Sequence, residues 1–473
     1  MVIKGKPPAF SMFASLFLAL CFQPPEPAPA RTERLAAWES LGYGMFIHFG
    51  MSTFTGDEYG GTPARSEVYA PTALDPEQWV LVARRSGMRY AVLTTKHCYG
   101  HCLWDSKFSD YDVASSKVPR DVVREFTEAC KKHGIEAGLY YLLGWDAYHQ
   151  ARRTPLEYEQ LCRNQLTELL TGYGPIGELW LDIPWDLGPD TQGALGRLYR
   201  RIKELQPSCL VLLNQGLRDG QQIARVQPTW RRQPAHRDAI GLWPTDLVDG
   251  ERTPPPEGGH APRQRVADQE RYLPMEVCDT LAEHWFWIEQ DGLRSVRTLV
   301  RLHEQARSRG ANFLLDVAPD RTGRIPDAAV VRLHEVHEVL TGKMPLPVNL
   351  TRGANAKASN VHAGDPRWRA EAALDEDSRT RWATDADVRT AWLEVDLGSE
   401  QTFTHAYLSE EWDRVRRFAI EVEDGDGWRA IHDGTRIGGD GLRIPLPKTT
   451  ARRVRLTVLD STGGPTIRDF ELQ

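Results

Sequence analysis

Residues 178–213, ELWLDIPWDLGPDTQGALGRLYRRIKELQPSCLVLL, carry the pattern that decides the fold of most of the chain. The apolar run Glu178–Asp182 comes first, the amphipathic stretch Leu195–Leu205 has the length of a helix, and a second apolar run, Cys209–Leu213, follows. Short apolar runs that alternate with such stretches are typical of strands joined by helices. We therefore expect a strand–helix–strand unit with parallel strands here.

The same alternation extends in both directions, from about Arg31 to Pro345. The other expected strands are Gly44–His48, Tyr90–Thr94, Ile135–Tyr141 and Asn312–Val317, and the other expected helices are Asp75–Ser86, Arg120–His133, Leu156–Leu170 and Ser295–Arg309. This much alternation predicts an α/β barrel, (β/α)8-like and of the TIM type. A doubly wound open sheet alternates in the same way, but no G-x-G-x-x-G or G-K-[ST] phosphate loop follows an early expected strand.

After Pro345 the pattern changes to short alternating segments separated by Gly, Asp and Pro turns. Such segments predict an all-β sandwich. We therefore expect three parts, which are a signal peptide and Pro-rich leader at residues 1–30, a barrel at 31–346 and a sandwich at 347–473.

The expected leader has the order of features found in signal peptides. Lys4 and Lys6 precede the mainly apolar run Phe10–Phe22, and an Ala-x-Ala-like cleavage site lies at Ala28–Ala30. The apolar run is too short for a stable membrane span. We expect a secreted or periplasmic protein.

The charge balance narrows the range of partners. The formal net charge is −7, and acidic and basic residues are interspersed along the chain. This pattern argues against nucleic acid or an anionic membrane surface as a partner and favours a neutral substrate.

Polar and aromatic side chains end four of the expected strands. His48 ends the first, Lys96 and His97 follow the second, Tyr141 ends the third and Asp182 ends the next. Active residues of barrels of this kind lie at the carboxyl ends of the strands. A single histidine there is commonly a satisfied core residue, but four such ends together indicate a carbohydrate site.

Collinear motifs add a specific resemblance. They are G-M-F-I-H-F-G at Gly44–Gly50, F-T-G-D-E-Y at Phe54–Tyr59, A-L-D-P-E-Q-W at Ala73–Trp79, L-T-T-K-H-C-Y-G-H-C-L-W at Leu93–Trp104, G-L-Y-Y-L-L-G-W-D at Gly138–Asp146, E-L-W-L-D at Glu178–Asp182, M-E-V-C-D-T-L with H-W-F-W at Met275–Trp287, and G-A-N-F-L-L-D-V-A-P-D-R-T-G at Gly310–Gly323. This set resembles the α-L-fucosidases of glycoside hydrolase family 29. The resemblance implies a fucosylated oligosaccharide or polysaccharide as substrate and no cofactor.

The resemblance also implies a retaining mechanism, in which one carboxylate attacks the sugar and a second acts as acid and base. Asp182 matches the nucleophile, and Trp180 lies on the same face of the expected strand. The alternative is that Asp182 caps a helix or pairs with an arginine. For the acid/base, Glu251 is the first candidate, Glu276 the second and Glu257 the third. This group needs a raised pKa.

Substrate contacts carry over to His48, Glu58, His97, Tyr141 and Trp180. The chain departs from the family's K-H-H-D-G-F motif, because Cys98 replaces the second histidine and Tyr99 the aspartate; His101 is a candidate substitute. A lost imidazole bears on which sugar is accepted. Two alternatives stay open, which are a hydrolase of the same fold for another sugar and a catalytically inactive glycan-binding protein.

The last segment has a resemblance of its own. N-A-x-A-S-x-V-H at Asn355–His362, A-L-D-E-D-S-R-T-R-W-A-T at Ala373–Thr384, W-L-E-V-D-L-G at Trp392–Gly398 and the stretch Arg452–Leu472 resemble the discoidin or coagulation-factor type C domain, a jelly-roll sandwich shared by sugar-binding modules of family 32. Members often hold a structural calcium, which the resemblance places near Asp375 and Asp377.

Overall fold

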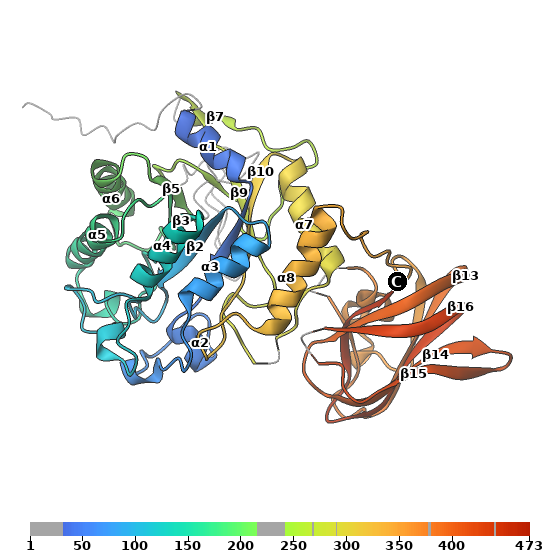
Figure 1. Ribbon diagram of the computed structural model, residues 1–473. Coiled ribbons are helices and arrows are strands. Elements are labelled where there is room, and N and C mark those ends of the chain that lie inside the picture. Colours follow the sequence, from blue (N-terminus) through green and yellow to red (C-terminus); the bar gives the residue numbers. More distant parts are fainter. Residues whose placement is uncertain (1–31, 215–241, 267–268, 290, 377–379, 439–440) are drawn as a thin grey trace, which may run out of the picture.

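The computed structural model describes residues 32–214, 242–266, 269–289, 291–376, 380–438 and 441–473 (Figure 1). The expected leader at residues 1–30 lies outside the described residues. The chain forms an α/β barrel from its blue to yellow segments and an all-β body from its orange to red segments, and the two lie side by side (Figure 1).

Eight parallel strands form the barrel, in the order β5-β4-β3-β2-β1-β10-β9-β6. They are β1 (Tyr43–Ile47), β2 (Tyr90–Lys96), β3 (Glu136–Leu142), β4 (Glu178–Asp182), β5 (Leu210–Leu213), β6 (Val248–Asp249), β9 (Met275–Thr280) and β10 (Ala311–Asp316). A parallel bridge between Leu212 and Leu247 joins the two ends of this order. The predicted TIM-type barrel is confirmed.

Helices cover the outside of the barrel (Figure 1). They are α3 (Pro76–Arg85), α4 (Val122–His133), α5 (Pro155–Gly172), α6 (Thr191–Leu205), α7 (Val296–Ser308) and α8 (Asp327–Leu340). The helix α1 (Glu33–Leu41) closes one end of the barrel, where Trp38 packs in the inner cluster, and the short helix α2 (Met51–Thr55) lies at the other end. Short 3-10 turns are Ser66–Val68, Val113–Ser115, Gln150–Arg152, His362–Gly364, Pro366–Trp368 and Ala370–Ala373, and an antiparallel hairpin joins β7 (Arg263–Val266) to β8 (Gln269–Tyr272). Local signals set the helix ends: a capping box of Thr154 and Glu157 starts α5, and Gly134 ends α4 in the left-handed conformation.

Both faces of the barrel strands are buried, and neighbouring residues face opposite ways. Met45 and Ile47 of β1 pack in the cluster between sheet and helices, whereas Phe46 packs inside the barrel with Trp180. Gly44 leaves room for a neighbour's ring, because a Cβ there would lie 2.5 Å from the ring of Tyr90. The inner cluster forms the floor beneath the carboxyl ends of the strands.

The C-terminal body is an antiparallel sheet in the order β12-β17-β13-β16-β14-β15, with β11 paired to β13. Its strands are β11 (Asn355–Ala358), β12 (Trp382–Ala383), β13 (Ala391–Glu410), β14 (Val415–Asp424), β15 (Gly427–Gly434), β16 (Leu442–Ser461) and β17 (Thr466–Leu472). The sheet encloses its own apolar core, which includes Trp382, Phe418 and Leu456.

Polar contacts join the two bodies. Glu376, whose side chain is 2% exposed, pairs with Arg297 and Arg301 of α7 and with Arg352. The hydroxyl of Tyr407 in β13 donates a hydrogen bond of 2.7 Å to a carbonyl in the loop before α7. The pairs with Arg297 and Arg301 hold the C-terminal body against the barrel.

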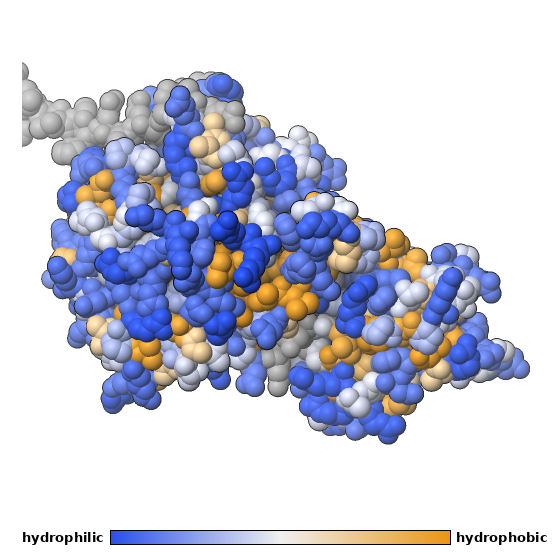
Figure 2. Space-filling model, in the orientation of Figure 1, coloured by the Kyte–Doolittle hydropathy of each residue, from blue (hydrophilic) through white to orange (hydrophobic). Residues whose placement is uncertain are grey.

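Polar residues cover most of the face seen in Figure 2, and apolar residues appear on it in small groups. Scattered apolar groups are normal on protein surfaces. Within the described ranges, none of the helices combines the length and the apolar character needed to cross a bilayer.

Candidate active site

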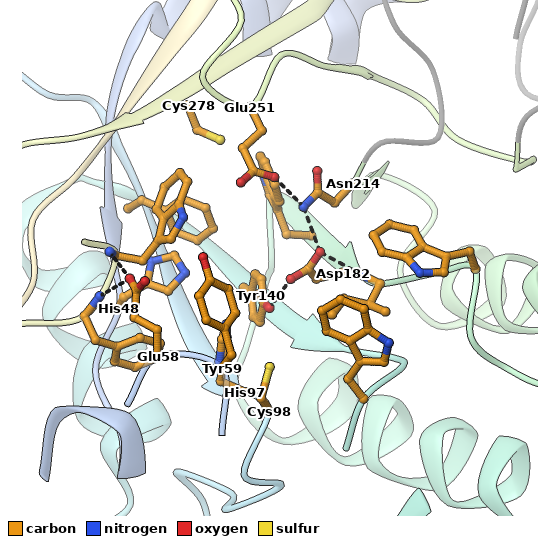
Figure 3. A pocket seen from close by; sticks show the side chains of 17 residues that line it. His48, Glu58, Tyr59, His97, Cys98, Tyr140, Asp182, Asn214, Glu251 and Cys278 are labelled. Carbon is orange, nitrogen blue, oxygen red and sulfur yellow. Dashed lines mark hydrogen bonds between the residues drawn. The ribbon is translucent and has the colours of Figure 1, made fainter. Parts of the chain in front are cut away.

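One pocket opens at the carboxyl end of the barrel strands (Figure 3). Every barrel strand except β10 supplies a lining residue, either from the strand itself or from the loop that follows it. The lining consists of Phe46, His48, Glu58, Tyr59, His97, Cys98, Tyr140, Trp145, Trp180, Asp182, Ile183, Trp185, Asn214, Glu251, Cys278, Trp285 and Phe286. This is the end of a TIM-type barrel at which active sites form.

Three donors hold the carboxylate of Asp182 at the end of β4 (Figure 3). The Tyr140 hydroxyl donates to Oδ2, while the Asn214 amide and the Ile183 backbone N–H each donate to Oδ1 at 2.7 Å. Burial raises the pKa of Asp182, and the hydrogen bonds from Tyr140 and Asn214 lower it. The carboxylate is therefore oriented on both oxygens before any ligand arrives.

Glu251 enters the same pocket from the loop after β6. The Asn214 amide nitrogen that donates to Asp182 also donates to Glu251 Oε2 at 2.9 Å, so one amide bridges the two carboxylates. These two oxygens are no farther apart than the sum of the two bond lengths. Retaining glycosidases hold their two carboxyl groups roughly 5 to 5.5 Å apart and inverting ones roughly 6.5 to 9.5 Å, and a shared amide favours the shorter separation.

A buried acid supports His48, which follows β1. His48 Nδ1 lies 2.7 Å from Oδ1 of Asp316, at the end of β10, and both side chains are nearly inaccessible to solvent. Burial lowers the pKa of His48 to about 3 and raises that of Asp316 well above its usual range. Both directions disfavour charge in this pair, so His48 presents a neutral imidazole to the pocket.

Glu58 and His97 complete the same side of the pocket (Figure 3). Glu58 Oε1 accepts the backbone N–H groups of Trp285 and Phe286, which ties the loop after β1 to the loop after β9. The His97 ring lies between Tyr140 and Phe286, at centroid distances of 5.6 and 4.8 Å. Its buried Nδ1 has no hydrogen-bond partner in the described part of the chain.

Six of the residues expected from the sequence thus line one pocket: His48, Glu58, His97, Trp180, Asp182 and Glu251. Tyr141 does not. Its hydroxyl donates to Gln165 at 2.6 Å and accepts from Lys96 at 3.0 Å, on the helix side of β3. The pocket tyrosine is its neighbour Tyr140, because successive side chains of a strand point to opposite faces.

Glu276 lies inside the barrel but below the pocket, two residues before Cys278 on β9. Its side chain accepts hydrogen bonds from the Tyr90 hydroxyl and, at 2.7 Å, from the Trp180 indole. Burial raises the pKa of Glu276 to about 7 and that of its carboxyl neighbour Glu178 well above the usual range. The structure therefore places Glu276 in the barrel floor rather than on the pocket lining.

Two further candidates lie away from the lining. Glu257 is exposed on the surface. His101 is buried between the rings of Tyr69 and Tyr111, at centroid distances of 5.3 and 5.0 Å, so it does not replace the missing second histidine. Cys98 itself faces the pocket and takes that place.

Several lining residues were not expected. Asn214 directly follows the strand β5, so the rule that polar residues end barrel strands would have found it. Trp285 and Phe286 lie in a motif that the resemblance had already matched, without a role assigned to them. Tyr59 and Trp145 also lie in matched motifs without a role assigned to them, whereas Trp185 lies on a loop outside the motifs, where the sequence offers no periodic signal.

The calcium prediction for the C-terminal body stays a prediction. Asp377 lies outside the described residues. Both carboxylate oxygens of Asp375 accept from the Thr380 hydroxyl, at 2.8 and 2.9 Å. Within the ranges that the structure describes, no three His, Cys, Asp or Glu side chains gather in a way that would hold a metal ion.

Comparisons with known proteins agree with this geometry. The family model described as Alpha-L-fucosidase matches residues 64–342, and the model described as F5/8 type C domain matches residues 355–470. Alpha-L-fucosidase 1 of Arabidopsis thaliana is 28% identical over 449 residues, which are 93% of this chain and 86% of that protein.

Two solved structures share the fold. A glycoside hydrolase 29 family member from an unknown rumen bacterium has a TM-score of 0.53 and 24% identity, over 93% of this chain and 76% of that one. The α-L-fucosidase AlfC from Lactobacillus casei, in complex with α-L-fucose product, has a TM-score of 0.51 and 22% identity, over 66% of this chain and 100% of that one.

Proposed function

The chain belongs to the α-L-fucosidase family and is therefore a glycoside hydrolase, and on this premise we propose that it removes terminal fucose from glycans by a retaining mechanism. The observation that carries the proposal is the amide of Asn214, which holds Asp182 and Glu251 side by side in one pocket. The spacing suits a nucleophile that attacks the anomeric carbon directly, without a water between.

In the first step an Asp182 oxygen forms a bond to the anomeric carbon while the bond from that carbon to the leaving oxygen breaks. Glu251 gives its proton to the leaving oxygen. In the second step Glu251 takes a proton from water, the water oxygen attacks the anomeric carbon, and the bond to Asp182 breaks. Two inversions give net retention.

The remaining pocket groups suit a deoxyhexose. His48, Glu58 and His97 offer hydrogen bonds to ring hydroxyls, and the Phe286 ring offers an apolar surface to a methyl group. Cys98 supplies a weaker hydrogen-bond donor than the imidazole of the family motif. This substitution favours, as a second candidate, a hydrolase of the same fold for a different sugar.

Aryl glycosides of several sugars test the proposal. We expect the fucoside to be cleaved with the highest kcat/KM, and Asp182→Ala to lose several orders of magnitude in kcat. A 2-fluorinated fucosyl donor should label Asp182. Highest turnover of another aryl glycoside would favour the second candidate, and no turnover of any would refute the activity.

Acid/base variants test the role of Glu251. Glu251→Gln should lose more activity toward a poor leaving group than toward an activated aryl group, because only the poor leaving group needs a proton. Glu257→Gln, at the surface, is the matched control. Equal losses for both leaving groups would contradict the assignment of Glu251.

We also propose that the protein is exported, on the pattern of residues 1–30 alone. Mass spectrometry of protein recovered from the periplasm or medium should find an N-terminus near Arg31. An uncleaved cytoplasmic product would contradict export.

A further inference from the structure

Trp145 and Trp185 form a part of the pocket wall to which the mechanism gives no role. Trp145 lies in the loop after β3 and Trp185 in the loop after β4, three residues beyond Asp182. Both side chains are half-buried. Their rings meet edge to face, with centroids 6.2 Å apart and an interplanar angle of 87°. The two indoles therefore make a right-angled aromatic corner beside the nucleophile.

The order of strands divides the pocket into two halves. His48 and Glu58 follow β1, His97 follows β2 and Phe286 follows β9, three strands that lie together in the barrel with only β10 between β1 and β9. Figure 3 shows three of these, His48, Glu58 and His97, together on one side of Asp182. These side chains form the half that suits the sugar to be cleaved.

The other half comes from the consecutive strands β3, β4, β5 and β6. It holds Asp182, Asn214 and Glu251 together with the two tryptophans. In an eight-stranded barrel β3 lies opposite β9, so the loop that carries Trp145 lies across the mouth from the loop that carries Phe286. The leaving oxygen must lie beside Glu251, and Glu251 belongs to the half that holds the tryptophans.

The loops of this corner are held in strained but fixed conformations. Trp145 has φ 59° and Ile183 has φ 48°, both in the left-handed region that non-glycine residues seldom adopt. The loops pack closely, because a Cβ on Gly144 would lie 2.7 Å from the carbonyl oxygen of Ile183. The Gln150 amide also bonds the Asp186 carbonyl at 2.8 Å. Strain of this kind persists where the surroundings enforce it, which is common at functional sites.

We propose that Trp145 and Trp185 bind the leaving group, and that this group is a neutral pyranose to which the fucose is attached. This inference rests on the proposed function. The apolar C–H face of a pyranose stacks on an indole. The charged lining residues among those described are acidic, Glu58, Asp182 and Glu251, and include no lysine or arginine. Acidic groups beside the corner disfavour a sulfated or carboxylated leaving sugar by charge repulsion.

Two substrates with the same fucosyl group separate this role from general damage to the pocket. α-L-Fucosyl fluoride has no sugar in its leaving group, whereas a fucosyl disaccharide with a neutral hexopyranose has one. We expect Trp185→Ala to lower kcat/KM for the disaccharide at least tenfold more than for the fluoride. Trp185→Phe should recover most of the difference, because phenylalanine still offers an aromatic face.

Trp145→Ala should show the same imbalance between the two substrates. Trp412→Ala is the matched control, because Trp412 is 44% exposed on the C-terminal body. Equal losses on both substrates in the two pocket variants would overturn the leaving-group role. So would wild-type turnover of the fluoride together with no turnover of disaccharides in any of the (1→2), (1→3), (1→4) and (1→6) linkages. Failure of the wild type on the fluoride as well would instead refute the fucosidase activity itself.

Discussion

Replacing Tyr140 with phenylalanine should move the acidic limb of the pH–activity profile to higher pH. Asp182 must be ionised to attack the sugar, and the Tyr140 hydroxyl donates a hydrogen bond to its Oδ2. Burial keeps the pKa of Tyr140 well above its ordinary value, so the hydroxyl stays protonated and remains a donor throughout the working range. Removing the donor destabilises the carboxylate, and the pKa of Asp182 therefore rises.

The size of the shift follows from the strength of the bond. A hydrogen bond to a charged group contributes about 1.5 to 3 kcal/mol. Because one pKa unit corresponds to about 1.4 kcal/mol, the midpoint of the acidic limb should rise by about 1 to 2 pH units. Asn214 and Ile183 still donate to Oδ1, so the carboxylate keeps its orientation and some activity survives.

The assay is kcat/KM for an aryl fucoside as a function of pH. Tyr141→Phe is the matched control, because it removes a buried hydroxyl from the next residue, on the helix side of the same strand. We expect Tyr141→Phe to lower stability without moving the acidic limb. An unshifted limb in Tyr140→Phe, or an equal shift in both variants, would refute the reasoning.

Three further predictions concern buried charged and polar groups. Burial raises the pKa of Glu276 to about 7, so the stability that its proton provides is complete at low pH and is lost as the pH rises through 7. Glu276→Gln should therefore lose less free energy of unfolding than the wild type between pH 5 and 8, measured by urea titration. Equal losses in the two proteins would contradict this prediction. Asp316→Ala should raise KM for an aryl fucoside about tenfold, because His48 loses the partner of its Nδ1, whereas Asp316→Asn should stay closer to wild type; equal KM values for the two variants would exclude a positioning role. Glu376→Gln should destabilise the docked C-terminal body by about 1.5 to 3 kcal/mol in calorimetry, because Arg297 and Arg301 lose a charged hydrogen-bond partner, while Asp365→Asn, which breaks a surface pair with Arg367, should cost much less. Similar costs for Glu376→Gln and Asp365→Asn would mean that the first pair is not a structural anchor.

The parts of the fold that the sequence predicts are those with a long, uninterrupted pattern. The helix α4 and the strand β2 lie close to their expected bounds, because an amphipathic or apolar run reports burial directly. The strands β6 and β9 were not expected. β6 has two residues, too few for any period, and β9 carries the acids Glu276 and Asp279 within its buried run.

The two tyrosines of β3 show why one site residue was misplaced by a single position. Both faces of a barrel strand are buried, so alternation between apolar and polar residues does not mark the inner face. The inner face is set by the pairing with neighbouring strands, and Tyr140 is paired with Trp180, which also faces inward. That register is a property of the assembled sheet. Asp182 and His97 were placed correctly from the sequence, because each lies at or just beyond the end of a strand.

Depth in the barrel, rather than residue type, separates the two leading candidates for the proton donor. The group must release a proton to the leaving oxygen and recover one from water in every cycle, so it has to reach the mouth of the pocket. Glu276 holds the indole of Trp180 from below, which fixes the floor on which Asp182 stands. Glu251 lies on a loop above β6 and shares an amide with Asp182. Asp182 and Glu251 both line the cavity, whereas Glu276 is not among its lining residues. The chain thus uses its deeper glutamate to build the site and, on the proposed mechanism, its shallower one to perform the proton transfer.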